Sequence, residues 1–191
     1  MRTVIIHYHL FKNAGTSLDA TFKENFSEER SEWLTKEFSN DHQENSEQVR
    51  QWILDNPQAK CFSSHTAMLP PPVIDDVKII AVIFIRHPLD RISSAYAFEK
   101  NQSDEGFGAV LARNTDLKGY IETRLSLIHD RQCRNFHTYR FAQMLETAQS
   151  ELEKSLETAE KLPFVGVVEY FDQSIKKLNT NQRYTLEQAK N

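Results

Sequence analysis

"TVIIHYHLFKNAGTSLDATF" (residues 3–22) contains three successive patterns that decide the fold. Residues 3–8 are a short apolar run rich in β-branched side chains, which is typical of a buried parallel strand. Leu18, Phe22 and Phe26 then recur every four residues and mark one face of a helix. The stretch between these patterns therefore predicts a loop that joins a strand to the N-terminus of a helix.

This loop has the composition of an anion-binding site. The turn collects several backbone N–H groups around one point, and the helix dipole adds partial positive charge there. Gly15 lets the backbone approach a ligand closely, and Lys12 supplies a full charge. Thr16 and Ser17 can cap the helix or donate hydroxyl hydrogen bonds. The alternative is an ordinary cap at Thr16 or Ser17 beside a surface lysine.

The loop differs from the common loop that binds nucleoside triphosphates. That loop needs a lysine directly after its last glycine, and here Thr16 stands in this place. The lysine instead precedes the glycine. This order counts against an ordinary ATP or GTP site.

A second strand and helix repeat the arrangement at "VIFIRHPLDRISSAY" (82–96). Arg86 lies at the carboxyl end of the strand, and Ser94 lies about two turns into the next helix. An arginine fork and a hydroxyl can share one phosphate. The alternative is that Arg86 pairs with a nearby acid and Ser94 is a plain helix residue. Ligands of parallel sheets bind beyond the carboxyl ends of the strands, so one ligand with two phosphates would satisfy both sites.

Strands and helices alternate along the rest of the chain, which predicts an α/β fold with a central parallel sheet covered on both sides. We expect strands at 60–65, at 77–85 and at the start of 163–178, and helices at 47–57, 88–100, 116–129, 134–162 and the end of 163–178. The helix at 134–162 is expected to break near its middle, because it is longer than most. Residues 27–47 are expected to be exposed helix or loop, and residues 101–115 a loop.

Length and composition restrict the class of protein. A chain of 191 residues suits one domain, expected to span residues 1–191. The net charge of −4 argues against a nucleic-acid partner. Cys61 and Cys133 form no CxxC pair and indicate reduced thiols. No run approaches the roughly 20 apolar residues of a membrane span, and the first residues are too polar for a secretory signal. We therefore expect a cytoplasmic protein.

Four stretches resemble motifs of the sulfotransferases that use 3′-phosphoadenosine 5′-phosphosulfate (PAPS). "HLFKNAGTSL" (9–18) resembles their 5′-phosphosulfate loop, often H-I-P-K-T-G-G-T-S. "RHPLDRISSAY" (86–96) is similar to their 3′-phosphate motif, R-x-P-x-x-R-x-x-S-A-Y. "FVGVVEYFDQSIKKL" (164–178) and, more weakly, "NFHTYRF" (135–141) resemble F-V-G-x-x-E-x-F-D-x-S and N-x-Q-T-R of the carbohydrate-type, heparan sulfate 2-O-sulfotransferase-like branch. The motifs follow the family order.

The resemblance implies a P-loop-like three-layer sandwich, PAPS as donor, its bisphosphate PAP as product, and no metal. Lys12 would touch the bridging oxygen of the phosphosulfate, and Arg86 and Ser94 would hold the 3′-phosphate. The remaining donor-binding positions that it implies are Asn13, Ala14, Gly15, Thr16, Ser17 and Thr138. The chain departs from the family pattern at three places: Ala14 replaces the first glycine of the usual pair, His137 a common glutamine and Tyr139 a common arginine.

A base must take the proton of the acceptor hydroxyl, and histidine is suited to this near neutral pH. His65 follows the strand at 60–65, and "SSHTAM" (63–68) resembles the branch's G-H-x-x segment with Ser64 in place of glycine. We therefore predict His65 as the base. The alternatives are His7, His9 and His87. The histidines show no metal-ligand spacing, so we predict no metal site.

These features predict an enzyme that moves a sulfuryl group from PAPS to the hydroxyl of a carbohydrate or another small molecule. Trp33 and Trp52 could stack on a sugar ring or pack in the core. One alternative is a P-loop kinase or phosphotransferase, which the misplaced lysine and the lack of a clear Mg²⁺-binding carboxylate count against. The other is a non-catalytic nucleotide-binding module with the same fold.

Overall fold

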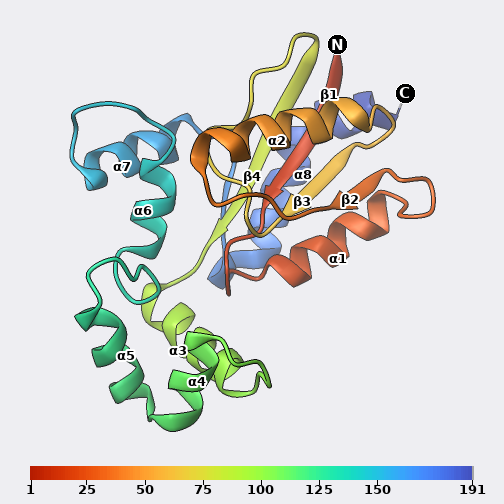
Figure 1. The fold of residues 1–191 in the computed structure, drawn as a ribbon. Coiled ribbons are helices and arrows are strands. Elements are labelled where there is room, and N and C mark those ends of the chain that lie inside the picture. The colour runs from red at the N-terminus through yellow and green to blue at the C-terminus, as the bar shows by residue number, and fades with distance from the viewer. Residues whose placement is uncertain (191) are drawn as a thin grey trace.

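A five-stranded parallel sheet organises the chain in the computed structural model, which describes the backbone of residues 1–190 and the side chains of residues 1–180 (Figure 1). In spatial order the strands are β2 (Trp33–Thr35), β3 (Cys61–Ser64), β1 (Arg2–Tyr8), β4 (Val77–Ile85) and β5 (Val165–Val167). The chain first builds the sheet on one side of β1 and then crosses to the other side. This reversal is the place where parallel sheets bind ligands.

The pairing of the strands fixes which chain segments meet at the sheet edge. β1 pairs with β4 in parallel from Arg2 opposite Val77 to Tyr8 opposite Ile83. On its other side, β1 pairs with β3, and Tyr8 lies opposite Ser64. The segments that follow these three strands therefore start side by side at one edge.

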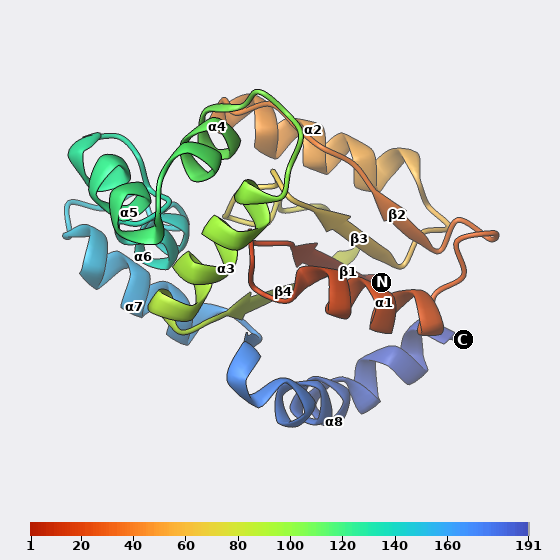
Figure 2. The same cartoon turned by 90° about the horizontal axis from the view of Figure 1, so that it is seen from below.

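Helices cover both faces of the sheet (Figure 2). The helix α2 (His42–Asp55) covers one face, and α1 (Gly15–Asn25) and α8 (Phe171–Lys190) cover the other. The side chains of β1 alternate between the two cores: Ile6 packs with Trp52 of α2, and Ile5 packs with Leu18 of α1. The result is the three-layer α/β fold that the sequence predicts.

A second group of helices lies beyond the carboxyl ends of the strands (Figure 1). These helices are α3 (Pro88–Lys100), α4 (Phe107–Asn114) and α5 (Leu117–Ser126). A buried network holds α3 and α5 together: Arg124 forms an ion pair of 2.9 Å with Glu99, which also accepts a hydrogen bond of 2.8 Å from Tyr120. The next two helices, α6 (Phe136–Ala142) and α7 (Glu151–Lys161), lie beside the sheet, and Phe141 of α6 packs in the same core as α2.

Two expectations about the elements were wrong. Residues 101–115 contain the helix α4, because Gly106 begins it and Ala109 and Ala112 bury one face. The expectation of exposed helix or loop at 27–47 is wrong for Trp33–Thr35, which form the edge strand β2. The start of α2 in the same range agrees with it, and Asp41 caps this helix by accepting from the N–H of Glu44. The predicted break within 134–162 is confirmed by the separation of α6 from α7.

Neither tryptophan is available to a ligand. Trp33 is 6% exposed and Trp52 is 7% exposed, and each packs in one of the two cores. The alternative that they pack in the core is therefore the correct one. Within residues 1–190, none of the helices combines the length and the apolar composition that a membrane crossing needs.

Candidate active site

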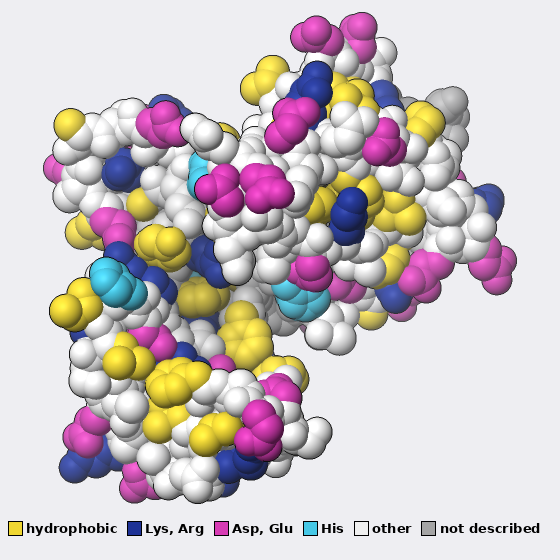
Figure 3. All heavy atoms as spheres, viewed as in Figure 1, with side chains coloured by type: hydrophobic (Ala, Val, Ile, Leu, Met, Phe, Trp, Pro, Cys, Tyr) yellow, Lys and Arg dark blue, Asp and Glu magenta, His cyan; other side chains and the backbone are white. Residues whose placement is uncertain are grey.

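A pocket of about 510 Å³ opens at the carboxyl edge of the sheet. Its walls come from the loop after β1, the start of α1, the ends of β3 and β4, the helix α3 and Val168. The lining residues are His9, Phe11, Lys12, Ala14, Gly15, Thr16, Ser17, His65, Arg86, Ser94, Phe98 and Val168. Figure 3 shows this face of the molecule hollowed between the sheet half and the helices α3–α5.

Most of the predicted site residues meet in this pocket. The lining contains Lys12, Ala14, Gly15, Thr16, Ser17, His65, Arg86 and Ser94. Two predicted residues lie elsewhere. Asn13 is 1% exposed, and its side chain donates to the carbonyl of Phe11 and accepts from Nε2 of His137 at 2.8 Å. Thr138 belongs to α6 and does not line the pocket.

The N-terminus of α1 presents free donors to the pocket. Ala14 precedes the helix in the left-handed conformation, with φ 58° and ψ 23°, and makes no side-chain cap. Within the described chain, the backbone N–H groups of Gly15, Thr16 and Ser17 have no hydrogen-bond acceptor. Thr16 and Ser17 are exposed and lie inside the first turn, so the alternative of an ordinary cap is wrong. Such a terminus favours an anion.

The residue at position 15 must be a glycine because the His9 ring packs against it. A Cβ atom at this position would lie 1.9 Å from Cδ2 and 2.1 Å from Nε2 of His9. The absence of a side chain at Gly15 therefore leaves room for the His9 ring against the first turn of α1. This contact has no signal in the sequence.

Lys12 lines the pocket and lies over an aromatic ring. Its Nζ atom lies 4.3 Å from the centre of the Phe98 ring, and within the described residues no carboxylate pairs with it. Phe98 also contacts Phe11, with 5.5 Å between the ring centres. The aromatic face holds the ammonium group by a cation–π contact and leaves its charge uncompensated. Phe98 was not predicted from the sequence.

Arg86 lies at the junction between β4 and α3. The N–H of His87 donates to Glu169 at 2.8 Å, which fixes the turn. Burial opposes ionisation of Glu169, but this hydrogen bond and the nearby Arg86 charge lower the pKa of its carboxyl. Arg86 has no ion pair within 4.0 Å in the described part of the chain, contrary to the alternative that it pairs with an acid. Its guanidinium is thus free for a ligand.

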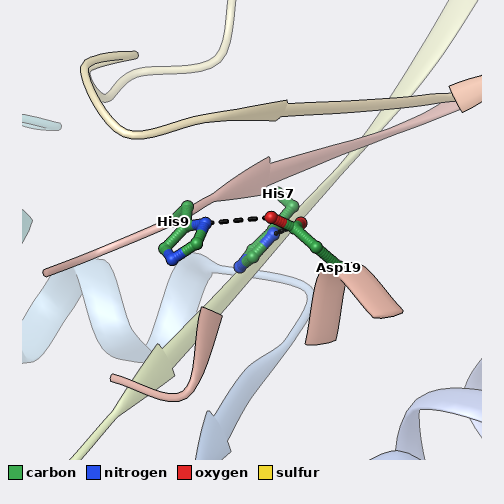
Figure 4. A group of neighbouring side chains, drawn as sticks. All are labelled: His7, His9 and Asp19. Carbon is green, nitrogen blue, oxygen red and sulfur yellow. Dashed lines mark hydrogen bonds and ion pairs between the residues drawn. The ribbon is translucent and has the colours of Figure 1, made fainter. Parts of the chain in front are cut away.

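Asp19 joins two of the histidines in a hydrogen-bonded cluster beside the pocket (Figure 4). Its carboxylate accepts from Nδ1 of His7 at 2.7 Å, from Nδ1 of His9 at 3.0 Å and from the Ser63 hydroxyl at 2.7 Å. Burial raises the pKa of Asp19, but these three donors hold it well below its usual range. For His7, burial dominates and lowers the pKa, which favours a neutral ring. Asp19 was not predicted, since only the folded chain brings it to the histidines.

His7, His9 and Asp19 could also be considered as metal ligands, because their ligand atoms lie within 4.8 Å of one another. The sequence did not predict this grouping. Around a tetrahedral ion with bonds of 2.0–2.1 Å, ligand atoms lie roughly 3.3–3.5 Å apart. The contacts of 2.7 and 3.0 Å are instead hydrogen-bond lengths. The geometry therefore favours a hydrogen-bonded cluster.

His65 stands at the open side of the same cluster. Its ring stacks on His9, with 3.9 Å between the ring centres and an angle of 26° between the planes. Its Nδ1 atom lies 3.1 Å from a carboxylate oxygen of Glu37, and its side chain is 54% exposed. The second ring nitrogen, Nε2, is thus left for a ligand. His87, in contrast, does not line the pocket.

The fold and the pocket define an α/β protein that gathers a lysine, an arginine and a free helix N-terminus around one ligand site. A model of the sulfotransferase family matches residues 1–189. The chain belongs to the sulfotransferase family. A protein from Archaeoglobus fulgidus, described as uncharacterized, is similar to it, with 42% identity over 190 residues that cover 95% of this chain and 74% of that protein. These similarities identify the family and not a branch within it.

Proposed function

We propose that this sulfotransferase moves a sulfuryl group from PAPS to the hydroxyl of a carbohydrate or another small molecule. One observation carries the proposal: Lys12, Arg86 and the free N-terminus of α1 line a single pocket of about 510 Å³. Two positive side chains from two different strand ends suit a nucleotide with a phosphate at each end of its ribose. His65 lines the same pocket and supplies a base.

The residues around the pocket fit the donor. The N–H groups of Gly15, Thr16 and Ser17 would hold the 5′-phosphosulfate, together with the backbone N–H of Ala14. Asn13 would act by shaping the loop, because its own N–H already donates to the carbonyl of Leu10 at 3.2 Å. Arg86 and Ser94 would hold the 3′-phosphate, which ATP lacks. PAPS, when bound, supplies an activated sulfuryl group. Lys12 would neutralise the charge that develops on the bridging oxygen, in a site whose donors are already in position.

His65 would take the proton of the attacking hydroxyl on Nε2. Glu37 lies 3.1 Å from Nδ1, and a carboxylate there favours the tautomer with a proton on Nδ1. The same carboxylate stabilises the imidazolium that forms when the proton arrives. This arrangement supports His65 over His87, which lies outside the pocket.

A second pocket of about 410 Å³ offers a place for the acceptor. It shares the wall residue Phe11 with the donor pocket, and its lining includes the aromatic rings of Phe136 and Tyr139. Arg131 lies over the Tyr139 ring at 4.7 Å, so this pocket offers aromatic surface together with positive charge. The proposal involves residues 1–191 acting as one domain, with no nucleic acid and no metal. The proposed location of the protein is the cytoplasm, and the free thiols of Cys61 and Cys133 support this.

The first test is thermal unfolding of the protein with PAP, compared with ADP and with ATP and Mg²⁺. A ligand at about 100 times its dissociation constant adds about 2.7 kcal/mol to the free energy of unfolding, a shift on the order of 5–10 °C for this size. The expected result is a shift with PAP alone. A shift only with ATP and Mg²⁺ would favour the kinase alternative, although no Asp or Glu is among the described residues that line the pocket. No shift at all would contradict the proposal.

Transfer of labelled sulfate from PAPS to a panel of sugar and small-molecule alcohols separates an enzyme from a binding module. Lys12→Ala is expected to lower turnover by at least tenfold without unfolding the protein. Lys36→Ala is the matched control, because Lys36 also lies over an aromatic ring, at 5.6 Å from Phe38, but outside the pocket. Tight PAP binding without transfer to any alcohol would leave only the binding module.

A further inference from the structure

We propose that His9 is a donor-binding residue that contacts the 5′-phosphosulfate as an imidazolium, held in place by Asp19. This inference rests on the proposed function and adds a charged contact to it. It assigns the structural reason for the glycine at position 15 and for the aspartate at position 19. It also implies that donor binding is coupled to the uptake of one proton.

The position of the His9 ring supports this contact. His9 lines the pocket, and its Cδ2–Nε2 edge lies against Gly15 at the first turn of α1. The free N–H groups of α1 gather at the same turn. Because Nδ1 donates to Asp19 at 3.0 Å, Nε2 is the nitrogen left for a ligand. An anion at the helix terminus would therefore lie beside Nε2.

The charges around the ring determine its protonation state when an anion binds. A neutral ring with its proton on Nδ1 would present a lone pair to the anion, which is repulsive. A second proton on Nε2 converts this contact into a charge-assisted hydrogen bond. Asp19 stays ionised and compensates the positive ring from the other side, since its three donors lower its pKa. The anion and the proton therefore favour each other's binding.

Other charged and titratable groups stack on the ring or line the same pocket. His7 comes from β1, Lys12 from the loop, Arg86 from the end of β4, and His65, paired with Glu37, from the end of β3. His7 is buried, and burial lowers its pKa. His65 is thus the neighbour whose titration could be confused with that of His9, and it must be removed in the test.

The cluster provides a matched control. His7 donates to the same carboxylate as His9, at 2.7 Å, but it is 1% exposed and does not line the pocket. If the cluster serves only to stabilise the fold, replacing either histidine should have the same effect on ligand binding. If His9 contacts the ligand, only the replacement of His9 should change it.

The experiment is isothermal titration calorimetry of PAP in the His65→Gln background between pH 7 and 9. In this range the 5′-phosphate lies above its second pKa of about 6, so the charge of the ligand stays constant. Buffers of different ionisation enthalpy report the number of protons taken up. Proton uptake and an affinity that falls with pH are expected with His9 present. Adding His9→Gln should abolish the proton uptake and the pH dependence, and should weaken the binding of PAP at pH 7 by roughly tenfold to a hundredfold.

Two further comparisons distinguish a failure of this inference from a failure of the proposed function. Adenosine 3′-monophosphate, which lacks the 5′-phosphate, should bind equally with and without His9→Gln. His7→Gln should leave the proton uptake unchanged. The inference is overturned if PAP binds without proton uptake, or if His7→Gln abolishes it as His9→Gln does. Failure of wild-type protein to bind PAP would instead overturn the proposed function, and this inference with it.

A spectroscopic measurement covers the case in which His9→Gln does not fold. Nitrogen-15 spectra of the imidazole rings in the His65→Gln protein report the protonation of each ring nitrogen. On addition of PAP, the His9 signals should change from a ring protonated on Nδ1 alone to a ring protonated on both nitrogens. A His9 ring that stays neutral in the PAP complex contradicts the proposal.

Discussion

Replacing Gly15 by alanine tests how tightly the site is packed. The new Cβ atom would lie 1.9 Å from Cδ2 of His9, whereas ordinary contacts of this kind begin at 3.4 Å. The ring must therefore move by more than an ångström. Because the hydrogen bond from Nδ1 of His9 to Asp19 is 3.0 Å long, such a movement breaks it.

The size of the effect follows from these two losses. Overpacking costs about 1–3 kcal/mol, and the loss of a hydrogen bond to a charged group costs about 1.5–3 kcal/mol. Alanine returns up to about 1 kcal/mol, because it favours a helix over glycine. The expected net loss is about 1.5–6 kcal/mol in the free energy of unfolding, or roughly 3–24 °C in Tm for a chain of this length.

Urea and thermal denaturation measure this loss, and a double-mutant cycle with His9→Ala assigns its cause. Without the ring, the new Cβ atom has room, so Gly15→Ala should cost less than about 0.5 kcal/mol in the His9→Ala background. Gly119→Ala is the control, since its Cβ atom would meet its nearest neighbour at 3.2 Å. An equal cost of Gly15→Ala with and without the His9 ring would refute the reasoning.

Two further predictions concern Ala14, in the loop before α1, and His137, in α6. Ala14→Gly should raise the free energy of unfolding by about 0.5–1 kcal/mol, because φ is 58° there. Ala97→Gly, at an exposed position in the last turn of α3, should instead lower it by up to about 1 kcal/mol. Thermal unfolding measures both, and a loss at Ala14 would contradict the argument. Burial lowers the pKa of His137 to about 4, so between its ordinary value near 6.5 and pH 4 the unfolded chain binds a proton that the folded chain does not. Stability should therefore fall by about 3 kcal/mol as the pH drops through this range, and His137→Gln, which keeps a donor to Asn13, should remove most of this loss in urea titrations at pH 7 and 4.5. A glutamine variant that loses stability as steeply as the wild type would contradict this.

The parts of the fold that the sequence predicted best are those whose signal is local. The strand at 77–85 and the helix at 88–100 were predicted with the bounds of β4 and α3, because an apolar run that only Lys78 interrupts is followed by a proline that can begin a helix. The helix α4 was missed because its eight residues are too few to show a clear helical periodicity. The strand β2 was missed because three residues gain strand structure only by pairing with β3.

The site residues show the same difference between local and tertiary signals. Glycine, lysine, arginine and hydroxyl residues in motifs at two strand ends predicted most of the pocket lining. The contacts of Asp19, Glu37 and Phe98 could not be predicted, because each comes from a segment outside the motifs and meets the pocket only through tertiary packing. The cluster of His7, His9 and Asp19 depends on the stacking of α1 on β1, which no sequence pattern specifies.

The pairing of β1 with β4 has a consequence for selectivity. The loop with Lys12 follows β1, and the turn with Arg86 follows β4. These two strands are paired over seven consecutive residue pairs, from Arg2 with Val77 to Tyr8 with Ile83. Their separation is therefore a fixed dimension of the sheet, and not a property of a mobile lid. For the proposed donor, this fixed dimension would favour ligands whose two negative groups are spaced to match it.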